Sequence, residues 1–389
     1  MNDTPTTSRA RLDSIDVVRG VIMILMALDH TRDFFGMPGQ NPTNLAQASA
    51  ALFLTRWITH FCAPVFFLLT GTGACLSLRR QSPGELSQFL ATRGLWLIFL
   101  ELVLARCLVY QFNVDYQVTM LLVLWALGWA MITLSVLVRA PAGLATAFGV
   151  VLVLGHNLFD AVGAGPLWSI LHAPGVILNS QGHVVFVSYP LIPWIGVTAA
   201  GYGLGQIYDW DAPRRRGFLL RLGLSLCLAF VVIRGVNGYG DAAHWTQHQT
   251  AALTTLSFLN TTKYPPSLLF LLMTLGPALL LLWAFDHETP RSVRPALVFG
   301  RVPLFYYLLH FLLIHLLAVA TCYLRFGSAH WMFESPDLAH YPFSAPPGWG
   351  YPLPIVYGIW ALVVATAYPF CAAFSALKQR RTNRWLGYL

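Results

Sequence analysis

The chain has 389 residues, of which 56% are hydrophobic and only 10% are charged. A soluble globular protein carries about 25% charged residues, so this composition excludes an ordinary soluble domain and predicts a polytopic membrane protein. The formal net charge is +8, but the basic residues lie in short segments between apolar runs. That placement is typical of cytoplasmic loops and argues against a nucleic-acid-binding surface.

Ten apolar segments are long enough to cross a bilayer, at about 20 residues per crossing. They lie at about 15–35, 57–78, 93–113, 117–138, 142–160, 187–208, 217–235, 265–285, 298–323 and 352–377. With the N-terminus inside, the arginine-rich connections and the basic C-terminus all fall on the cytoplasmic side. We predict an all-α membrane bundle at 15–377, with cytoplasmic tails at 1–14 and 378–389.

The first span is unusual because it carries many ionisable residues. They are Asp16, Arg19, Asp29, His30, Arg32 and Asp33. Such groups are costly at membrane depth unless they face the protein interior or a water-filled cavity, so they indicate function. Arg19 and His30 are eleven residues apart, about three helical turns, and therefore project from one face about 16 Å apart. Asp29 can pair with Arg32 one turn later, beside the imidazole.

The second and third spans add further polar groups. His60 enters the membrane at the depth expected for His30, so the two imidazoles could share a site, although a helix–helix hydrogen bond would also explain His60. Gly71 would permit close helix packing or close approach of a ligand. Glu101 and Arg106 are expected to form an ion pair, with each other or with charges of the first span.

Later segments supply four more candidates. Trp194 follows two prolines at an irregular helix end, where it could stack on a ligand or belong to the interfacial aromatic belt. Lys263 is the only lysine before residue 378, and it could bind an anionic or sugar group or extend to lipid headgroups. His310 and His315 project about 140° apart and so cannot both face one small site. His310 is the better cavity-lining candidate because it is closer to mid-membrane. Arg301 resembles Arg19 in depth.

The sequence predicts no metal site. The cysteines have no CxxC spacing and lie in or near apolar segments, as buried thiols do. His244 and His248 are one helical turn apart, but no third ligand accompanies them. His156 and Asp160 have the same spacing, for which either a local hydrogen bond or a cavity-lining role is a sufficient explanation.

Several stretches together resemble a known family. They are SIDVVRGVIMILMALDHTRDFF, RWITHFCAPVFFLLTGTGA, YPLIPWIGVTAAGYGLG, TTKYPPSLLFLLMTLG and FGRVPLFYYLLHFLLIH. They are similar to the bacterial branch of the heparan-alpha-glucosaminide N-acetyltransferase catalytic-domain family. The spacing of Arg19 and His30 also resembles the signature of the wider transmembrane acyltransferase superfamily, whose members modify extracytoplasmic sugars. The resemblance implies a helical bundle in which cytoplasmic acyl-CoA donates to an acceptor on the other side.

We therefore predict a multi-pass acyltransferase of the bacterial inner membrane that moves an acyl group, expected to be acetyl, to a sugar or glycan. His30 is the predicted general base or acyl carrier, since histidine titrates near neutral pH. Asp29 and His60 are the other predicted catalytic residues. Arg19 and Arg301 are predicted to bind acyl-CoA phosphates. The predicted acceptor-binding residues are Arg32, Asp33, Trp194, Lys263 and His310.

The predicted partners are the lipid bilayer, acetyl-CoA as co-substrate and an extracytoplasmic saccharide, with no nucleic acid; a homodimer is left open. The leading alternative is a transporter, in which Arg19, Asp29 and His30 would form a proton or substrate relay. A third interpretation is a membrane scaffold, whose polar groups only hold helices together.

Overall fold

The computed structural model describes residues 13–163 and 165–380, and most of this chain is helical. The first half contains α1 (Asp13–Phe35), α2 (Ala50–Thr59), α3 (Cys62–Ser77), α4 (Pro83–Phe99), a π-helix (Leu100–Tyr110), β1 (Val118–Leu121), α5 (Val123–Leu137), α6 (Ala142–Gly155), α7 (Pro166–Leu171), β2 (Gly175–Ser180) and β3 (His183–Val187). The second half contains α8 (Leu191–Gly205), α9 (Ala212–Val236), α10 (Ala251–Leu259), α11 (Leu268–His287), α12 (Ala296–Arg301), α13 (Pro303–Phe326) and α14 (Leu353–Arg380).

Within the described residues, six helical segments are long and apolar enough to cross a membrane. They are Ala50–Ser77, Ala142–Phe159, Ala212–Val236, Leu268–His287, Pro303–Phe326 and Leu353–Arg380. The chain is therefore a multi-pass membrane protein, and the predicted total of ten spans and the cytoplasmic termini stay predictions. The expected tails at 1–14 and 378–389 lie largely outside the described residues, and so do Arg9, Arg11, Arg381 and Arg384.

A small sheet corrects the prediction that the chain is all helical. The strand order is β1-β3-β2, with β1 parallel and β2 antiparallel to β3. The predicted helix 117–138 is thus wrong at its start, because residues 118–121 pair with β3 and the helix begins only at Val123. A short apolar run does not distinguish a strand from a buried helix, and β-branched Val and Thr favour the strand.

Two other helix boundaries differ from prediction for local reasons. The predicted start at residue 93 is wrong: α4 begins at Pro83, because Ser82 and Glu85 form a reciprocal capping box at its N-terminus. The predicted single helix 298–323 is divided into α12 and α13 at Val302, whose φ is −132° and ψ is 52°. The residue before a proline avoids the α-helical region, and Pro303 follows Val302.

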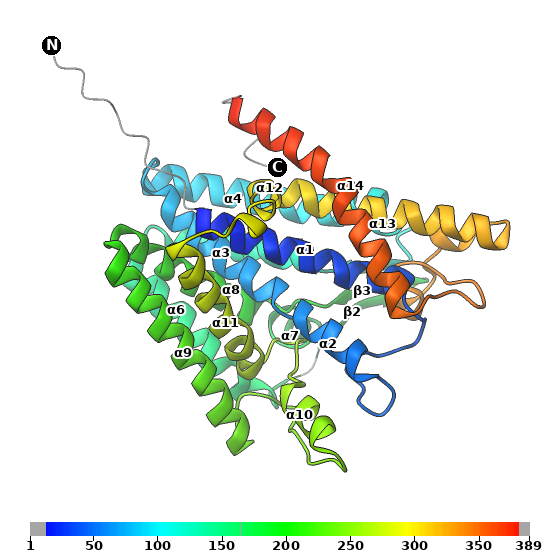
Figure 1. Cartoon of the computed structure of the whole chain (residues 1–389), viewed down its shortest axis with the longest axis horizontal. Coiled ribbons are helices and arrows are strands. Elements are labelled where there is room, and N and C mark those ends of the chain that lie inside the picture. The colour runs from blue at the N-terminus through cyan, green and yellow to red at the C-terminus, as the bar shows by residue number, and fades with distance from the viewer. Residues whose placement is uncertain (1–12, 164, 381–389) are drawn as a thin grey trace.

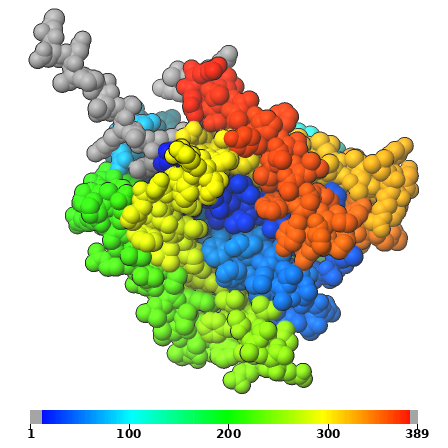
Figure 2. Space-filling view, in the orientation of Figure 1, coloured from blue at the N-terminus to red at the C-terminus, as the bar shows by residue number. Residues whose placement is uncertain are grey.

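Helix α1 lies at the centre of the arrangement and packs against α2, α3 and α11 to α14 (Figure 1). On the face drawn in Figure 2, only a strip of α1 (dark blue) is visible between the yellow segment and the orange-to-red C-terminal helix α14. Close approach of backbones holds one end of α1. A Cβ added to Gly20 would lie 1.8 Å from the carbonyl oxygen of Ala296, and one added to Gly300 would lie 1.8 Å from that of Asp16.

A similar contact joins α3 and α8, and it supplies a stability test. A Cβ on Gly71 would lie 1.9 Å from the carbonyl oxygen of Thr198, whereas a Cβ on Gly73 would meet nothing within 4 Å. We expect Gly71→Ala to lower the free energy of unfolding by about 1–3 kcal/mol, because the two backbones must separate. Gly73→Ala is the matched control and should leave it unchanged. Thermal unfolding in detergent measures both, and equal stability of the two variants would contradict the packing.

Candidate active site

A cavity of about 980 Å³ lies at the His30 end of α1. Its wall comes from the end of α1, the 36–49 loop, the start of α3, the Lys263–Tyr264 segment, α13 and the loop before α14. That last loop is fastened to α1 through Tyr351 N and Trp349 Nε1, which donate to the carbonyl oxygens of Phe35 (2.8 Å) and Phe34 (3.0 Å). Helices thus form one part of the cavity wall and loops form the rest.

His30 lines this cavity, and His310, which is not among the described lining residues, is hydrogen-bonded to it. His30 Nδ1 lies 2.8 Å from His310 Nε2, and His310 Nδ1 lies 2.8 Å from the carbonyl oxygen of Tyr306. A carbonyl oxygen only accepts, so His310 Nδ1 carries the proton and its Nε2 accepts from His30 Nδ1–H. In neutral His30 the remaining nitrogen, Nε2, then holds a lone pair. The chain therefore fixes the tautomer in which His30 is ready to accept a proton.

Aromatic side chains fix the position of the His30 ring. Phe311 stacks on it with ring centroids 3.9 Å apart, and Tyr307 meets it edge-on at 6.3 Å. The Tyr307 hydroxyl lies 2.6 Å from that of Tyr110, and both residues line the cavity. In such a pair one hydroxyl donates to the other, so the accepting tyrosine keeps its own O–H free to donate.

Charged side chains surround the same cavity. Asp29 is buried and pairs with Arg56 and with Arg32, whose Nη2 lies 2.8 Å away and also 2.6 Å from Asp33. Lys263 lines the cavity with an exposed fraction of only 8%, and its ammonium lies 5.2 Å from the ring centroid of Tyr264. The lining thus holds three cations and two carboxylates, an excess of one positive charge.

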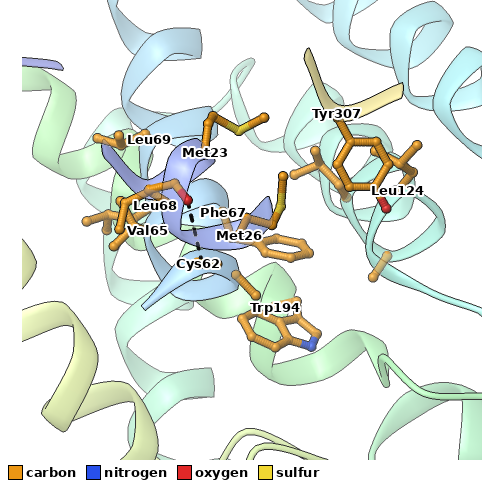
Figure 3. Close-up of a cluster of buried hydrophobic side chains, with 14 of the residues drawn as sticks. Met23, Met26, Cys62, Val65, Phe67, Leu68, Leu69, Leu124, Trp194 and Tyr307 are labelled. Atoms are coloured by element: carbon orange, nitrogen blue, oxygen red, sulfur yellow. Dashed lines mark hydrogen bonds between the residues drawn. The ribbon is translucent and has the colours of Figure 1, made fainter. Parts of the chain in front are cut away.

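His60 and Trp194 are predicted site residues that are not among the described residues lining the cavity. His60 caps the end of α2, is almost fully buried, and packs against Phe270 at 5.3 Å between ring centroids. His30 Nδ1 is hydrogen-bonded to His310, and a role for His60 in the same site stays a prediction. Trp194 is fully buried and stacks on Phe67 at 4.6 Å, within the apolar cluster of Figure 3.

Arg19 and Arg301 lie together at the opposite end of α1. Arg19 Nη1 donates to Asp16 (3.1 Å) and to the carbonyl oxygen of Gly300 (3.2 Å), while Arg301 pairs with Asp13 at 3.5 Å. The predicted proximity in depth of the two arginines agrees with this geometry. Neither is among the described residues that line the cavity, whose α1 lining begins at Met26.

Glu101 and Arg106 were expected to pair with each other or with charges of the first span, and the structure gives each of them other partners. Glu101 Oε2 accepts from the backbone N–H of Trp125 at 2.8 Å, at the start of α5. Arg106 instead donates to the side-chain and backbone oxygens of Asn113 and lies 3.4 Å from Asp115. The two side chains therefore fasten different segments next to the π-helix.

Comparison with known protein families shows which family the chain belongs to. The family described as "Heparan-alpha-glucosaminide N-acetyltransferase, catalytic" matches residues 11–236, more than half of the sequence. The chain belongs to this family. No curated protein matches the sequence significantly. Membership places the chain in a membrane acetyltransferase-type family.

The matched region of the heparan-alpha-glucosaminide N-acetyltransferase family contains His30, Asp29 and Arg56. Lys263 and His310 lie after the matched region in the sequence. In the fold, Lys263 lines the cavity and His310 is hydrogen-bonded to His30, which also lines it. Sequence reasoning did not single out the tyrosine pair or Phe311. Tyr307 and Phe311 lie within one turn of His310 in the FYYLLHF run, whereas Tyr110 is far from it in sequence.

Proposed function

We propose that this chain is an acyltransferase that moves an acetyl group from cytoplasmic acetyl-CoA to a hydroxyl or amine of an extracytoplasmic sugar or glycan. The observation that carries the proposal is the His30–His310–Tyr306 arrangement, which leaves a basic nitrogen of His30 at a polar cavity. Transfer to a hydroxyl or amine needs a base that removes the acceptor proton, and a neutral imidazole with a fixed tautomer fits that role.

In the direct route, His30 Nε2 takes the acceptor proton while the acceptor oxygen or nitrogen attacks the thioester carbonyl carbon. The tetrahedral intermediate carries negative charge on the former carbonyl oxygen. The free O–H of the Tyr110–Tyr307 pair, which also lines the cavity, would stabilise it. When the C–S bond breaks, CoA thiolate leaves and receives the proton from His30.

In the two-step route, His30 Nε2 attacks the thioester carbonyl carbon, the C–S bond breaks, and CoA leaves as a thiolate that takes a proton from water. The acceptor oxygen or nitrogen then attacks the acetyl carbon of acetyl-His30, the N–C bond breaks, and the acceptor proton passes to water. Both routes use the same nitrogen and the same hydrogen bond to His310. The cavity charge supports an acceptor with anionic or hydroxyl groups, which Lys263 and the Arg32–Asp33 pair would bind.

Arg19 and Arg301 are the proposed ligands of the CoA phosphates, since guanidinium groups bind phosphate in a bidentate manner. Along α1, Arg19 and His30 are separated by about 16 Å. Ile22 and Met23, which lie between Arg19 and His30 on α1, are buried. Donor binding from the Arg19 end therefore requires the side chains around Met23 to move aside.

The test of this function is acceptor-dependent release of free CoA by purified protein in detergent. Acetyl-CoA is supplied with glucosamine or with a mixed glycan extract, and the free thiol is measured. An enzyme should turn over without any gradient, whereas a transporter would need sealed vesicles. Absence of CoA release, together with no thermal shift on adding acetyl-CoA, would overturn the proposal.

A further inference from the structure

A second polar cluster lies away from the His30 cavity, at the end of α6. It consists of His156, Asp160 and His172, each of which offers one ligand atom, and these atoms lie within 4.8 Å of one another. His156 and Asp160 come from the turn that ends the span, and His172 follows α7. None of the three is among the described residues that line the cavity at His30.

The two histidines are buried with ring nitrogens that lack hydrogen bonds. Their exposed fractions are 2% for His156 and 1% for His172. Both ring nitrogens of His156 and Nδ1 of His172 are buried without a hydrogen-bond partner in the described chain. A buried polar atom left unpaired costs about 1–3 kcal/mol, so three such nitrogens in one place require an explanation.

The carboxylate of this cluster is already oriented. Asp160 Oδ1 lies 2.9 Å from His172 Nε2, and Asn157 Nδ2 donates to Asp160 Oδ2 at 2.9 Å. Asn157 Oδ1 in turn accepts from the backbone N–H of Leu268 at 2.8 Å, where α11 begins. The Asp160 side chain is 27% exposed, which gives an ion a route from solvent. The neighbouring groups thus hold the three side chains in one small volume.

We propose that His156, Asp160 and His172 form a binding site for a divalent transition-metal ion, with Zn²⁺ the best match. Two imidazoles and one carboxylate are a donor set that zinc uses, whereas Mg²⁺ and Ca²⁺ take oxygen ligands. Zn–N bonds of about 2.0–2.1 Å in a tetrahedral site hold donor atoms about 3.3 Å apart, so binding draws the three side chains together. The ion ties the end of α6 to α7 and, through Asn157, to α11.

This inference departs from the sequence-based prediction of no metal. The cysteines and the His244–His248 pair gave no metal site, and for His156 and Asp160 either a local hydrogen bond or a cavity-lining role was expected. In the structure Asp160 pairs with His172, which is twelve residues later in the sequence. The ring of His156 lies against that of His172, with centroids 5.6 Å apart. The third ligand was therefore missed because the α7 segment, and not helical spacing, brings it to the site.

The test uses full-length protein in detergent, freed of metal by a chelator and titrated with Co²⁺ alone, followed by competition with Zn²⁺. We expect the visible absorption of Co²⁺ bound to nitrogen and oxygen ligands, bound metal by elemental analysis, and a thermal unfolding midpoint that rises with Zn²⁺. Asp160→Asn and His172→Asn should weaken Co²⁺ binding by about tenfold or more.

His244→Asn with His248→Asn is the matched control, because these residues are exposed and have the same spacing as His156 and Asp160. That variant should bind Co²⁺ as the unaltered protein does. A site variant that melts normally without metal yet binds Co²⁺ with unchanged affinity would overturn the inference, as would unaltered protein that shows no Co²⁺ spectrum. These readouts do not depend on CoA release, so this inference and the proposed function fail separately.

Discussion

Replacement of His30 with alanine should lower acceptor-dependent CoA release by about 100- to 10,000-fold, the range over which a positioned acid–base group contributes. The reason is that His30 Nε2 is the basic nitrogen at the cavity, and its tautomer is fixed by His310. The measurement is the rate of CoA release per folded protein at saturating acetyl-CoA. His330→Ala is the control, because His330 is exposed and is not among the described residues that line the cavity.

The folding of the His30→Ala variant is checked by its thermal unfolding, which should change little because His30 is partly exposed to the cavity. Equal rates for the variant and the unaltered protein would remove His30 from the chemistry. Intact-mass measurement of the unaltered protein, quenched after exposure to acetyl-CoA without acceptor, separates the two routes. An acetyl adduct that disappears in His30→Ala would support the two-step route.

His310→Leu is the second substitution with a large expected effect. His310 lies behind His30 and is fully buried, so it acts as a positioning residue. A hydrogen bond to a group that becomes charged is worth about 1.5–3 kcal/mol, which corresponds to a decrease in kcat of about 10- to 100-fold. The KM for the acceptor should stay the same, because His310 is not part of the described cavity lining.

Two further variants distinguish positioning from general stability. His310→Gln should recover part of kcat, because its amide oxygen can accept a hydrogen bond as His310 Nε2 does. His315→Leu removes a buried histidine of the same helix whose nitrogens lie 3.1 Å and 2.8 Å from the carbonyl oxygens of Val109 and Met332. It should lower thermal stability with little effect on kcat. A uniform loss of stability and rate across all three variants would contradict a positioning role.

The sequence predicted those features that depend on composition and helical spacing. Membrane spans follow from long apolar runs, and the family followed from motifs distributed along the chain, which the match over residues 11–236 confirms. The ion pair of Asp29 and Arg32, one turn apart on α1, is present as predicted. The expected divergence of His310 and His315 is also confirmed, since they contact different residues.

The features that the sequence did not predict depend on packing between distant segments. His30 pairs with His310, and not with His60, because α1 packs along α13 in a register that no local pattern encodes. Glu101 accepts the Trp125 N–H at the start of α5 because the first N–H groups of a helix have no partner within the helix. His172 joins His156 through an irregular segment, where periodicity gives no information.

The division of the cavity wall between helices and loops has an evolutionary consequence. Packed helices hold His30 (α1), His310 and Tyr307 (α13) and Tyr110 (the π-helix) in position. The 36–49 loop and the segment before α14 form another part of the cavity wall. Loops tolerate substitution and insertion far better than packed helices. Under the proposed function, substitutions in these loops alone would change the acceptor in descendants of this chain, while the residues around His30 stay the same.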